Sequence, residues 1–432
     1  NGPEEKGWRV TAQNFNLNRD YTKADAPEMQ AMLRLLEAWD PVLYVDMHVT
    51  DGAQFEIDVS NTIAPALNGD AALQPVGRGI TADLNKQLAA QSILAVDYYP
   101  QLRVDDDPTS GFDASLYPPR FSTGYWALRN RFAMLIETHS WKDYPRRVRV
   151  THNEIVILAE MMAKQGRAWR TLTREADKRA EQLGGQDVPL EFDVGPHTTL
   201  IDFRGYAYQR EPSAISGGLV TTYDPAKPQI WHIPFRDTVA PKLTVRAPRG
   251  AYVVPAAYAA WMGERLSLHG IRFERLDKAV AAANVDAFRA SKVTLSPATF
   301  ESHTTAKIEG EWKPERRDIP AGSLIVPIAQ PSARLILALL EPQSSDSYAG
   351  WGFFNGVFET KEYAEAYVAE QMGREMLAND PELAKAFKQR LATDPEFAKS
   401  PTARLDFFFN HHPAHDERLN LYPILRIAST KP

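Results

Sequence analysis

The chain has 432 residues, of which 44% are hydrophobic and 24% charged, and its formal net charge at pH 7 is −6. This length favours two domains over one, and the composition is that of a globular protein with a large core. Such a mild charge, with no basic stretch interleaved with aromatic residues, argues against a nucleic-acid partner. The absence of cysteine excludes disulfides, thiolate metal ligands and a cysteine nucleophile. No apolar run is long enough to span a membrane, and no signal peptide is recognisable.

The first predicted helix begins after Asp25 and ends at Asp40-Pro41. Asp25 is a residue type that caps helices, and Pro27 falls in the first turn, where its missing N–H costs little. Apolar residues recur at helical spacing within this segment: Met29, Met32, Leu33, Leu35 and Leu36. The apolar run Val42–Val45 then predicts a buried strand, which ends at Asp46-Met47-His48. Functional groups of α/β proteins gather beyond the carboxyl ends of strands, so His48 is a candidate site residue.

A second buried strand is predicted over Phe132–Ile136, and it also ends on polar residues, Glu137-Thr138-His139. A carboxylate directly after an apolar strand is costly to bury unless something uses it, which makes Glu137 the second candidate. The alternative is that Glu137 pairs with a nearby arginine, Arg129 or Arg131. The other elements predicted in this part are two helices and a turn-rich loop over the site: Ala82–Gln91, Arg149–Gln182 and Asp105–Pro119.

The predicted helix Arg149–Gln182 is ended by Gly184-Gly185-Gln186-Asp187, which marks the predicted boundary between two domains. Residues 1–187 are expected to form an α/β domain with a mixed, mostly parallel sheet flanked by helices. Residues 188–432 are expected to form an accessory α+β domain. Its predicted strands and helices are Thr199–Phe203, Gln229–Ile233, Lys242–Arg246, Ala251–Val254, Ala256–His269, Leu324–Ile328, Lys361–Leu377 and Asp380–Leu391.

Asn18-Arg19 is the third candidate. The planar guanidinium of arginine binds a carboxylate through two parallel hydrogen bonds, and the asparagine amide can add another. An ordinary exposed arginine is the alternative for Arg19 alone. For His48, a neutral imidazole is a good zinc ligand, and Asp46 or a backbone carbonyl would orient its other nitrogen. The alternative is a histidine that is merely hydrogen-bonded at a strand end.

The order of these residues resembles that in the zinc carboxypeptidases of the carboxypeptidase A type. Asn18-Arg19 comes first, then a strand closing on Asp46-Met47-His48, then Leu135-Ile136-Glu137. The stretch from Ser122-Thr123-Gly124-Tyr125 to Trp141 looks like bacterial members of that family, which often carry an extra C-terminal domain. The resemblance covers roughly residues 1–150 and implies a carboxypeptidase-like catalytic domain over residues 1–187.

The resemblance also implies a role for each matching residue. Asn18 and Arg19 would bind the C-terminal carboxylate of the substrate, His48 would ligate Zn²⁺, and Glu137 would act as the general base. The family also has a mobile tyrosine that serves the substrate. Tyr125 and Tyr117 are the alternatives for it here.

One part of the family pattern has no match. The first two zinc ligands of the family come from a His-x-x-Glu motif before the Asn-Arg pair, and none of the 17 residues before Asn18 is histidine. We expect these ligands on an upstream segment, because Asn1-Gly2-Pro3 reads as a loop in mid-domain. The alternative is that the metal has been lost. The family's oxyanion-stabilising arginine is also expected upstream, with Arg9 as the substitute within this sequence.

The sequence therefore predicts a zinc-dependent metallocarboxypeptidase, a hydrolase acting on a peptide or peptide-like small substrate with a free carboxylate. A zinc deacylase or amidase on the same fold and a metal-free carboxylate-binding pseudoenzyme are the alternatives. A periplasmic or secreted location is expected. The side-chain preference for substrate and the oligomeric state are not predicted.

Overall fold

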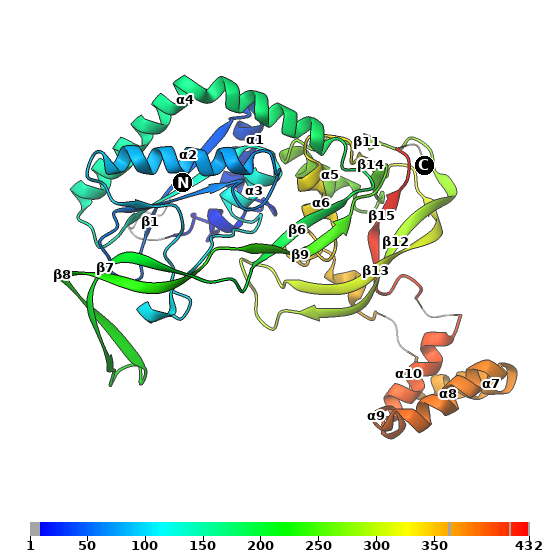
Figure 1. The fold of residues 1–432 in the computed structure, drawn as a ribbon. Helices are drawn as coiled ribbons and strands as arrows, with labels where there is room; N and C mark the ends of the chain where they lie inside the picture. Colours follow the sequence, from blue (N-terminus) through cyan, green and yellow to red (C-terminus); the bar gives the residue numbers. More distant parts are fainter. Residues whose placement is uncertain (1–8, 362–363, 414–415, 431–432) are drawn as a thin grey trace.

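The computed structural model describes residues 9–361, 364–413 and 416–430 (Figure 1). The helices are α1 (Pro27–Trp39), α2 (Gln74–Ala89), α3 (Ser122–Leu128), α4 (Tyr144–Ala180), α5 (Ala259–Leu268), α6 (Ala333–Leu340), α7 (Ala366–Asn379), α8 (Pro381–Thr393), α9 (Pro395–Lys399) and α10 (Pro401–His411). The strands are β1 (Leu43–Thr50), β2 (Val59–Ala64), β3 (Ala95–Val96), β4 (Phe112–Asp113), β5 (Phe132–His139), β6 (Asp187–Val194), β7 (Thr199–Pro212), β8 (Leu219–Arg236), β9 (Val239–Arg246), β10 (Ala251–Val254), β11 (Glu274–Arg275), β12 (Val280–Leu295), β13 (Ala306–Ile319), β14 (Leu324–Pro327) and β15 (Leu421–Ile427). The chain is thus of the mixed α/β class that the sequence predicts, with mixed sheets flanked by helices.

The sheet that carries the candidate residues has four strands in the order β1-β5-β2-β3. β1 and β5 are parallel, whereas β2 runs antiparallel to β5. α2 and α4 lie over one face and share a hydrophobic core with β2 and β5 (Figure 1). α1 and α3 belong to a second core, which reaches the other face of the sheet through Ala133 of β5. β5 is therefore buried along its whole length, which explains its continuous apolar run.

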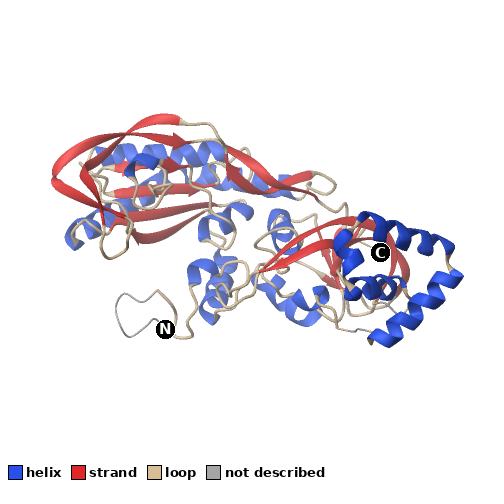
Figure 2. Ribbon diagram, turned by 90° about the horizontal axis from the view of Figure 1, so that it is seen from below, coloured by secondary structure: helices blue, strands red, loops and turns tan. Residues whose placement is uncertain are grey.

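A six-stranded sheet with the order β11-β14-β10-β15-β12-β13 forms the other large part of the molecule. The two sheets lie apart, each with its own helices, and β6 and β9 run between them (Figure 1, Figure 2). The core that holds α1 and α3 also contains β10, β14, α5 and α6. Elements on both sides of residue 187 therefore pack into one continuous core. The predicted boundary at residue 187 lies between the two sheets in the sequence, but side chains from both sides of it share one hydrophobic core.

Two appendages extend from this body. β7 and β8 form a long antiparallel hairpin, which is joined to the first part of the chain by the parallel pairing of β4 with β8. α7 to α10 form a small helical bundle that stands away from both sheets (Figure 1). Its own core consists of aromatic and leucine side chains: Leu383, Phe387, Phe397, Phe407 and Phe408. None of the helices in the described ranges has the length and apolarity needed to cross a lipid bilayer.

The elements predicted from periodicity are present, with shifted ends. α2 begins at Gln74, eight residues before the predicted start at Ala82, so Gly77 lies inside the helix. A Cβ at Gly77 would stand 2.2 Å from the carbonyl oxygen of Pro65, so only glycine permits this close approach. Residues 362–363 of the predicted helix Lys361–Leu377, and the starting residues Asn1-Gly2-Pro3, lie outside the described residues.

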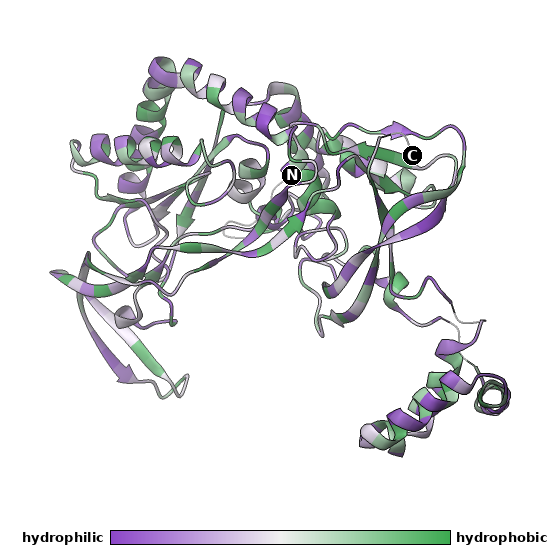
Figure 3. Ribbon diagram, turned by 45° about the vertical axis from the view of Figure 1, so that its right-hand side comes forward, coloured by the Kyte–Doolittle hydropathy of each residue, from purple (hydrophilic) through white to green (hydrophobic). Residues whose placement is uncertain are grey.

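The antiparallel pair β12–β13 is the largest element that the sequence analysis does not predict. β12 contains the alanine-rich run Val280–Ala290, whose residues favour a helix in isolation. Pairing with β13 and β15 on its two edges overrides that preference. Figure 3 shows the central strands of this sheet as hydrophobic, whereas α4 alternates between hydrophilic and hydrophobic residues.

Candidate active site

His48 and Glu137 lie side by side at the carboxyl ends of two neighbouring parallel strands. In the register of β1 and β5, His48 is paired with Glu137, and Asp46 is paired with Leu135. Residues two apart on a strand share a face, so Asp46 and His48 both lie on the side where Glu137 lies. The predicted strand-end candidates, 89 positions apart in sequence, are therefore brought together.

Asp46 orients His48. One carboxylate oxygen, Oδ1, lies 3.0 Å from Nε2 of His48, and the other, Oδ2, accepts a hydrogen bond of 2.6 Å from the hydroxyl of Ser122. The bond with Asp46 raises the pKa of His48 above its ordinary value, against the effect of burial. Burial alone would raise the pKa of Asp46, but the bonds from His48 and Ser122 hold it below the ordinary value. His48 is thus fixed through Nε2, and its Nδ1 makes no hydrogen bond with a described residue.

Glu137 is a buried carboxyl group next to this pair. Its side chain is 8% exposed, and burial raises its pKa to about 7, with the nearby charge of His48 acting in the opposite direction. Its Oε2 atom is buried and has no hydrogen-bond partner among the described residues. Such a group accepts and returns a proton near neutral pH.

The alternative partners of Glu137 are engaged elsewhere. Arg131 binds Asp40 and Asp177 at 2.8 and 2.9 Å. Arg129 is paired with Glu37. Neither Arg129 nor Arg131 is therefore the partner of Glu137.

Asn18 and Arg19 line the same cavity as His48 and Glu137. The cavity has a volume of about 600 Å³, and Arg9 also contributes to its wall. The guanidinium of Arg19 lies over the ring of Phe121, 3.9 Å from its centroid, and donates one hydrogen bond to the carbonyl of Asn18 at 2.7 Å. Burial, followed by the charge of Arg9, lowers the pKa of Arg19. Stacking on Phe121 holds the guanidinium plane, and its remaining N–H groups are available to an anion.

The amide of Asn18 is also available. Its Oδ1 atom is buried and has no hydrogen-bond partner in the described part of the chain. Which end of an amide carries the nitrogen is assigned from its hydrogen bonds, so a ligand carboxylate can take the NH₂ after a flip. Asn18 and Arg19 thus present two sets of donors to one cavity.

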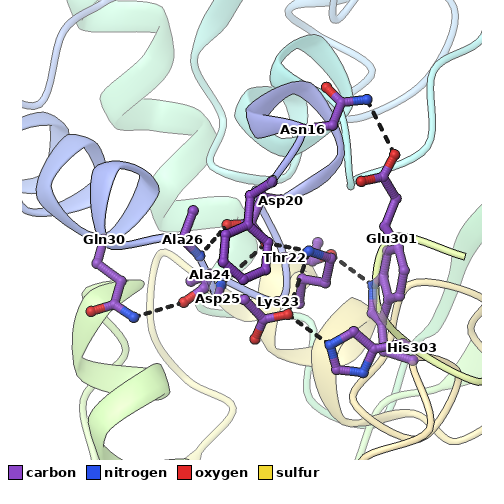
Figure 4. A network of polar contacts seen from close by, with 12 residues as sticks. Asn16, Asp20, Thr22, Lys23, Ala24, Asp25, Ala26, Gln30, Glu301 and His303 are labelled. Atoms are coloured by element: carbon purple, nitrogen blue, oxygen red, sulfur yellow. Dashed lines mark hydrogen bonds and ion pairs between the residues drawn. The ribbon is translucent and has the colours of Figure 1, made fainter. Parts of the chain in front are cut away.

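A buried ion-pair network anchors the segment that carries Asn18 and Arg19 (Figure 4). The ammonium group of Lys23 lies 2.5 Å from Oδ1 of Asp20, and both side chains are almost completely buried. The carboxylate of Asp20 also accepts the backbone N–H groups of Asp25 and Ala26, at 3.1 and 2.8 Å. Asp25 in turn is 2.7 Å from Nε2 of His303, far along the chain. The start of α1 is therefore held by Asp20, and not by the predicted cap Asp25.

Further contacts tie this segment to residues beyond position 300. Asn16 donates to Glu301 at 3.2 Å (Figure 4). The indole N–H of Trp351 donates to the hydroxyl of Thr22 at 3.1 Å. The position of Arg19 in the cavity therefore depends on residues from the C-terminal part of the protein.

The structure does not bring Tyr125 to this cavity. Tyr125 is 1% exposed, and its hydroxyl is 2.9 Å from Nδ1 of His269. Tyr117, the alternative tyrosine, lines the cavity, and so does Tyr99, which the sequence analysis does not single out. The hydroxyl of Tyr99 lies 2.6 Å from Oγ1 of Thr50, just beyond His48 on β1. Tyr117 and Tyr99 are thus the described tyrosines that line this cavity.

The donor set at this site matches part of a zinc site. His48 offers Nδ1 while its Nε2 is bound to a carboxylate, the arrangement usual for a zinc-bound histidine, and Glu137 offers an unpartnered carboxylate oxygen beside it. Within the described ranges, no group of three or more His, Cys, Asp or Glu side chains has the geometry to hold a metal ion. Of the zinc ligands expected from the sequence, the described residues include His48 alone, with Asp46 beside it.

A quarter of the chain is similar to named carboxypeptidases. It shows 30% identity over 110 residues to Carboxypeptidase 2 of Trichophyton tonsurans and of Trichophyton equinum, which is 26% of this chain and 20% of each relative. Carboxypeptidase 2 of Trichophyton rubrum shows the same identity over 112 residues. The chain thus spans about one fifth of the length of these relatives. No protein-family model and no solved structure matches the chain.

Proposed function

We propose that this chain carries the later half of the active site of a zinc-dependent metallocarboxypeptidase, which hydrolyses the C-terminal peptide or amide bond of its substrate. One observation carries the proposal: His48, Glu137, Asn18 and Arg19 line a single cavity. Carboxylate-binding donors, a metal-ligand nitrogen and a buried carboxyl group are the parts that such a hydrolysis requires. The similarity to the Carboxypeptidase 2 proteins supports the same activity.

In this proposal His48 ligates zinc through Nδ1, and the remaining ligands come from polypeptide outside the described residues. When bound, zinc polarises the scissile carbonyl and lowers the pKa of a bound water to near neutrality. Asp46 keeps the imidazole of His48 in one orientation and one tautomer.

The other residues of the chain bind substrate and move a proton. Arg19 takes the substrate's terminal carboxylate through its free N–H groups, and Asn18 adds a further donor. This contact fixes which bond lies beside Glu137. Oε2 of Glu137 accepts a proton from the attacking water and passes it to the departing amine nitrogen. A pKa of about 7 for Glu137 suits both steps, because the group is then neither a very weak base nor a very weak acid.

The substitution Glu137→Gln in the intact protein tests the proposal. We expect hydrolysis of peptides with a free C-terminal carboxylate to fall at least a thousandfold, while zinc measured by elemental analysis stays bound. Glu160→Gln, at an exposed carboxylate on α4, is the matched control and should leave the rate unchanged. Retained hydrolysis in Glu137→Gln would overturn the assignment of the general base.

A further inference from the structure

A second cavity adjoins the candidate active site. Its volume is about 720 Å³, and it shares Thr50, Asp51 and Tyr99 with the active-site cavity. The shared residues follow His48 on β1 or stand opposite it in the loop before β4. Because the same side chains form a wall of both cavities, the two cavities are adjacent, and together they are called the groove.

The far wall of the second cavity is built by the β7–β8 hairpin and is fixed in place. Oδ2 of Asp106 accepts the backbone N–H of Thr221 on β8 at 2.6 Å, and the backbone carbonyl of Asp106 accepts the hydroxyl of Thr221 at 2.5 Å. Opposite, the indole N–H of Trp141 donates to the carbonyl of Gly52 at 2.9 Å. The cavity is thus lined by elements that are tied to the body of the protein before any ligand binds.

The second cavity has the opposite charge from the carboxylate end of the active site. Three aspartates line it, Asp51, Asp105 and Asp106, and none of the described lysines or arginines does. Asp51 and Asp105 are exposed and make no ion pair with a described residue, whereas Asp106 is bound to Thr221. Arg9 and Arg19 lie in the first cavity and not in the second. The groove therefore runs from a cationic end to an anionic end.

Tyr223 lines the second cavity. Its ring packs against Trp231 and Tyr208, and its buried hydroxyl has no hydrogen-bond partner in the described ranges. A buried hydroxyl without a partner is unfavourable unless a ligand or water completes it. Together with Trp141, Tyr223 adds aromatic surface to the cavity wall.

From this arrangement, and resting on the function proposed above, we infer that the second cavity binds the substrate residues on the amino-terminal side of the scissile bond and selects peptides that carry a positive charge there. A substrate whose carboxylate meets Arg19 and whose scissile bond lies beside Glu137 must continue away from Arg19. The second cavity adjoins the first and is not lined by Arg19, so in this inference it receives these residues. Asp51 and Asp105 then face the incoming residues and favour lysine, arginine or a free amino terminus over an acidic residue.

Peptides of matched sequence test this inference. Acetylated tetrapeptides that share their last three residues and carry Lys, Gln or Glu first are compared with the acetylated C-terminal dipeptide. Binding is measured by calorimetry, and hydrolysis as kcat/KM, at low ionic strength. We expect the association constant and kcat/KM of the Lys peptide to exceed those of the Glu peptide by about three- to tenfold, because each exposed charge pair contributes modestly. The preference should shrink in 0.5 M salt.

Variants test whether the second cavity causes the preference for the Lys peptide over the Glu peptide. Asp105→Asn should lower the ratio of kcat/KM for the Lys peptide to kcat/KM for the Glu peptide two- to threefold. Asp105→Lys should bring this ratio to one or below. Asp83→Asn, at an exposed aspartate on α2, should leave the ratio unchanged.

The outcomes separate this inference from the proposed function. Charge-dependent binding without hydrolysis of any peptide overturns the peptidase assignment and supports the groove. Hydrolysis with no dependence on length or charge supports the peptidase and overturns the inference. A ratio that Asp105→Lys does not change also overturns it.

Discussion

Oδ1 of Asp46 lies 3.0 Å from Nε2 of His48, two residues further along the same strand. The two side chains share a face because β-strand side chains alternate, so the pairing follows from the spacing Asp-x-His alone. Under the proposed function, Nδ1 is then the nitrogen of His48 that would ligate zinc, and Asp46 is a positioning residue.

Substitution of Asp46 by asparagine should therefore impair the site without removing a group that touches substrate. We expect kcat/KM for free-carboxylate peptides to fall 10- to 100-fold, as is usual when the carboxylate behind a ligand histidine is lost. Zinc affinity, measured by competition with a chelator, should fall by a similar factor. An unchanged zinc affinity would contradict the positioning role of Asp46.

Arg19→Ala should act on substrate binding. Loss of a charge-assisted, bidentate contact corresponds to about 1.5–3 kcal/mol, or roughly 10- to 100-fold in kcat/KM. The loss should appear with free-carboxylate peptides and not with the same peptides amidated at the C-terminus. Arg34→Ala, at an exposed arginine of α1, is the control. An equal loss on both substrate forms would favour the deacylase or amidase alternative.

Glu154→Gln should change how stability depends on pH. Glu154 lies on α4 and is fully buried, and burial raises its pKa to about 8 from an ordinary value of 4.5. Between pH 4.5 and 8 the folded state therefore holds a proton that the unfolded state has lost. The contribution of Glu154 to the free energy of unfolding is highest below pH 4.5, where both states are protonated, and falls as the pH rises towards 8. At pH 8 the variant should be more stable than the wild type by on the order of 2–4 kcal/mol, and at pH 4.5 it should show no such gain.

Urea unfolding of both proteins across this pH range measures the difference. Glu160→Gln should follow the wild type at every pH, since its carboxylate is exposed. A stability difference for Glu154→Gln that does not grow with pH would show that Glu154 is ionised in the folded protein.

Lys23→Met should destabilise the protein strongly. The change leaves the carboxylate of Asp20 buried without its cation, and breaking one side of a buried pair costs about 3–5 kcal/mol. The midpoint of urea unfolding should fall accordingly, whereas Lys86→Met, at an exposed lysine of α2, should have little effect. A midpoint within error of the wild type would contradict the role of this pair as an anchor.

His48 and Glu137 could be singled out from the sequence because each follows an apolar strand. Such a strand is recognised from neighbouring residues alone, without knowing which strand it pairs with. Tyr117 and Tyr125 could not be separated in the same way. Tyr125 points towards His269, which is 144 positions away, and no pattern near Tyr125 signals that contact. The start of α1 was misjudged for a related reason. Asp25 has the cap residue type but binds His303, and the N-cap position falls on Ala26, whose backbone N–H is bound by Asp20.

The strands of the second sheet show the same limit. β12 pairs with β15, more than 100 positions later, and that pairing decides its conformation against its alanine content. The second cavity escaped prediction because its wall comes from β8, and only folding brings Thr221 to the loop at Asp106.

The link between Asp25 and His303, and the core shared across residue 187, also bear on how this protein could have evolved. A gene fragment encoding only the first 187 residues would carry Arg19 without the side chains that hold it in place. Recombination that exchanged the C-terminal region for an unrelated one would therefore disturb the carboxylate-binding end of the site. The small bundle α7–α10 has its own aromatic core, and it is the part of the chain that could be gained, lost or replaced with least effect on that site.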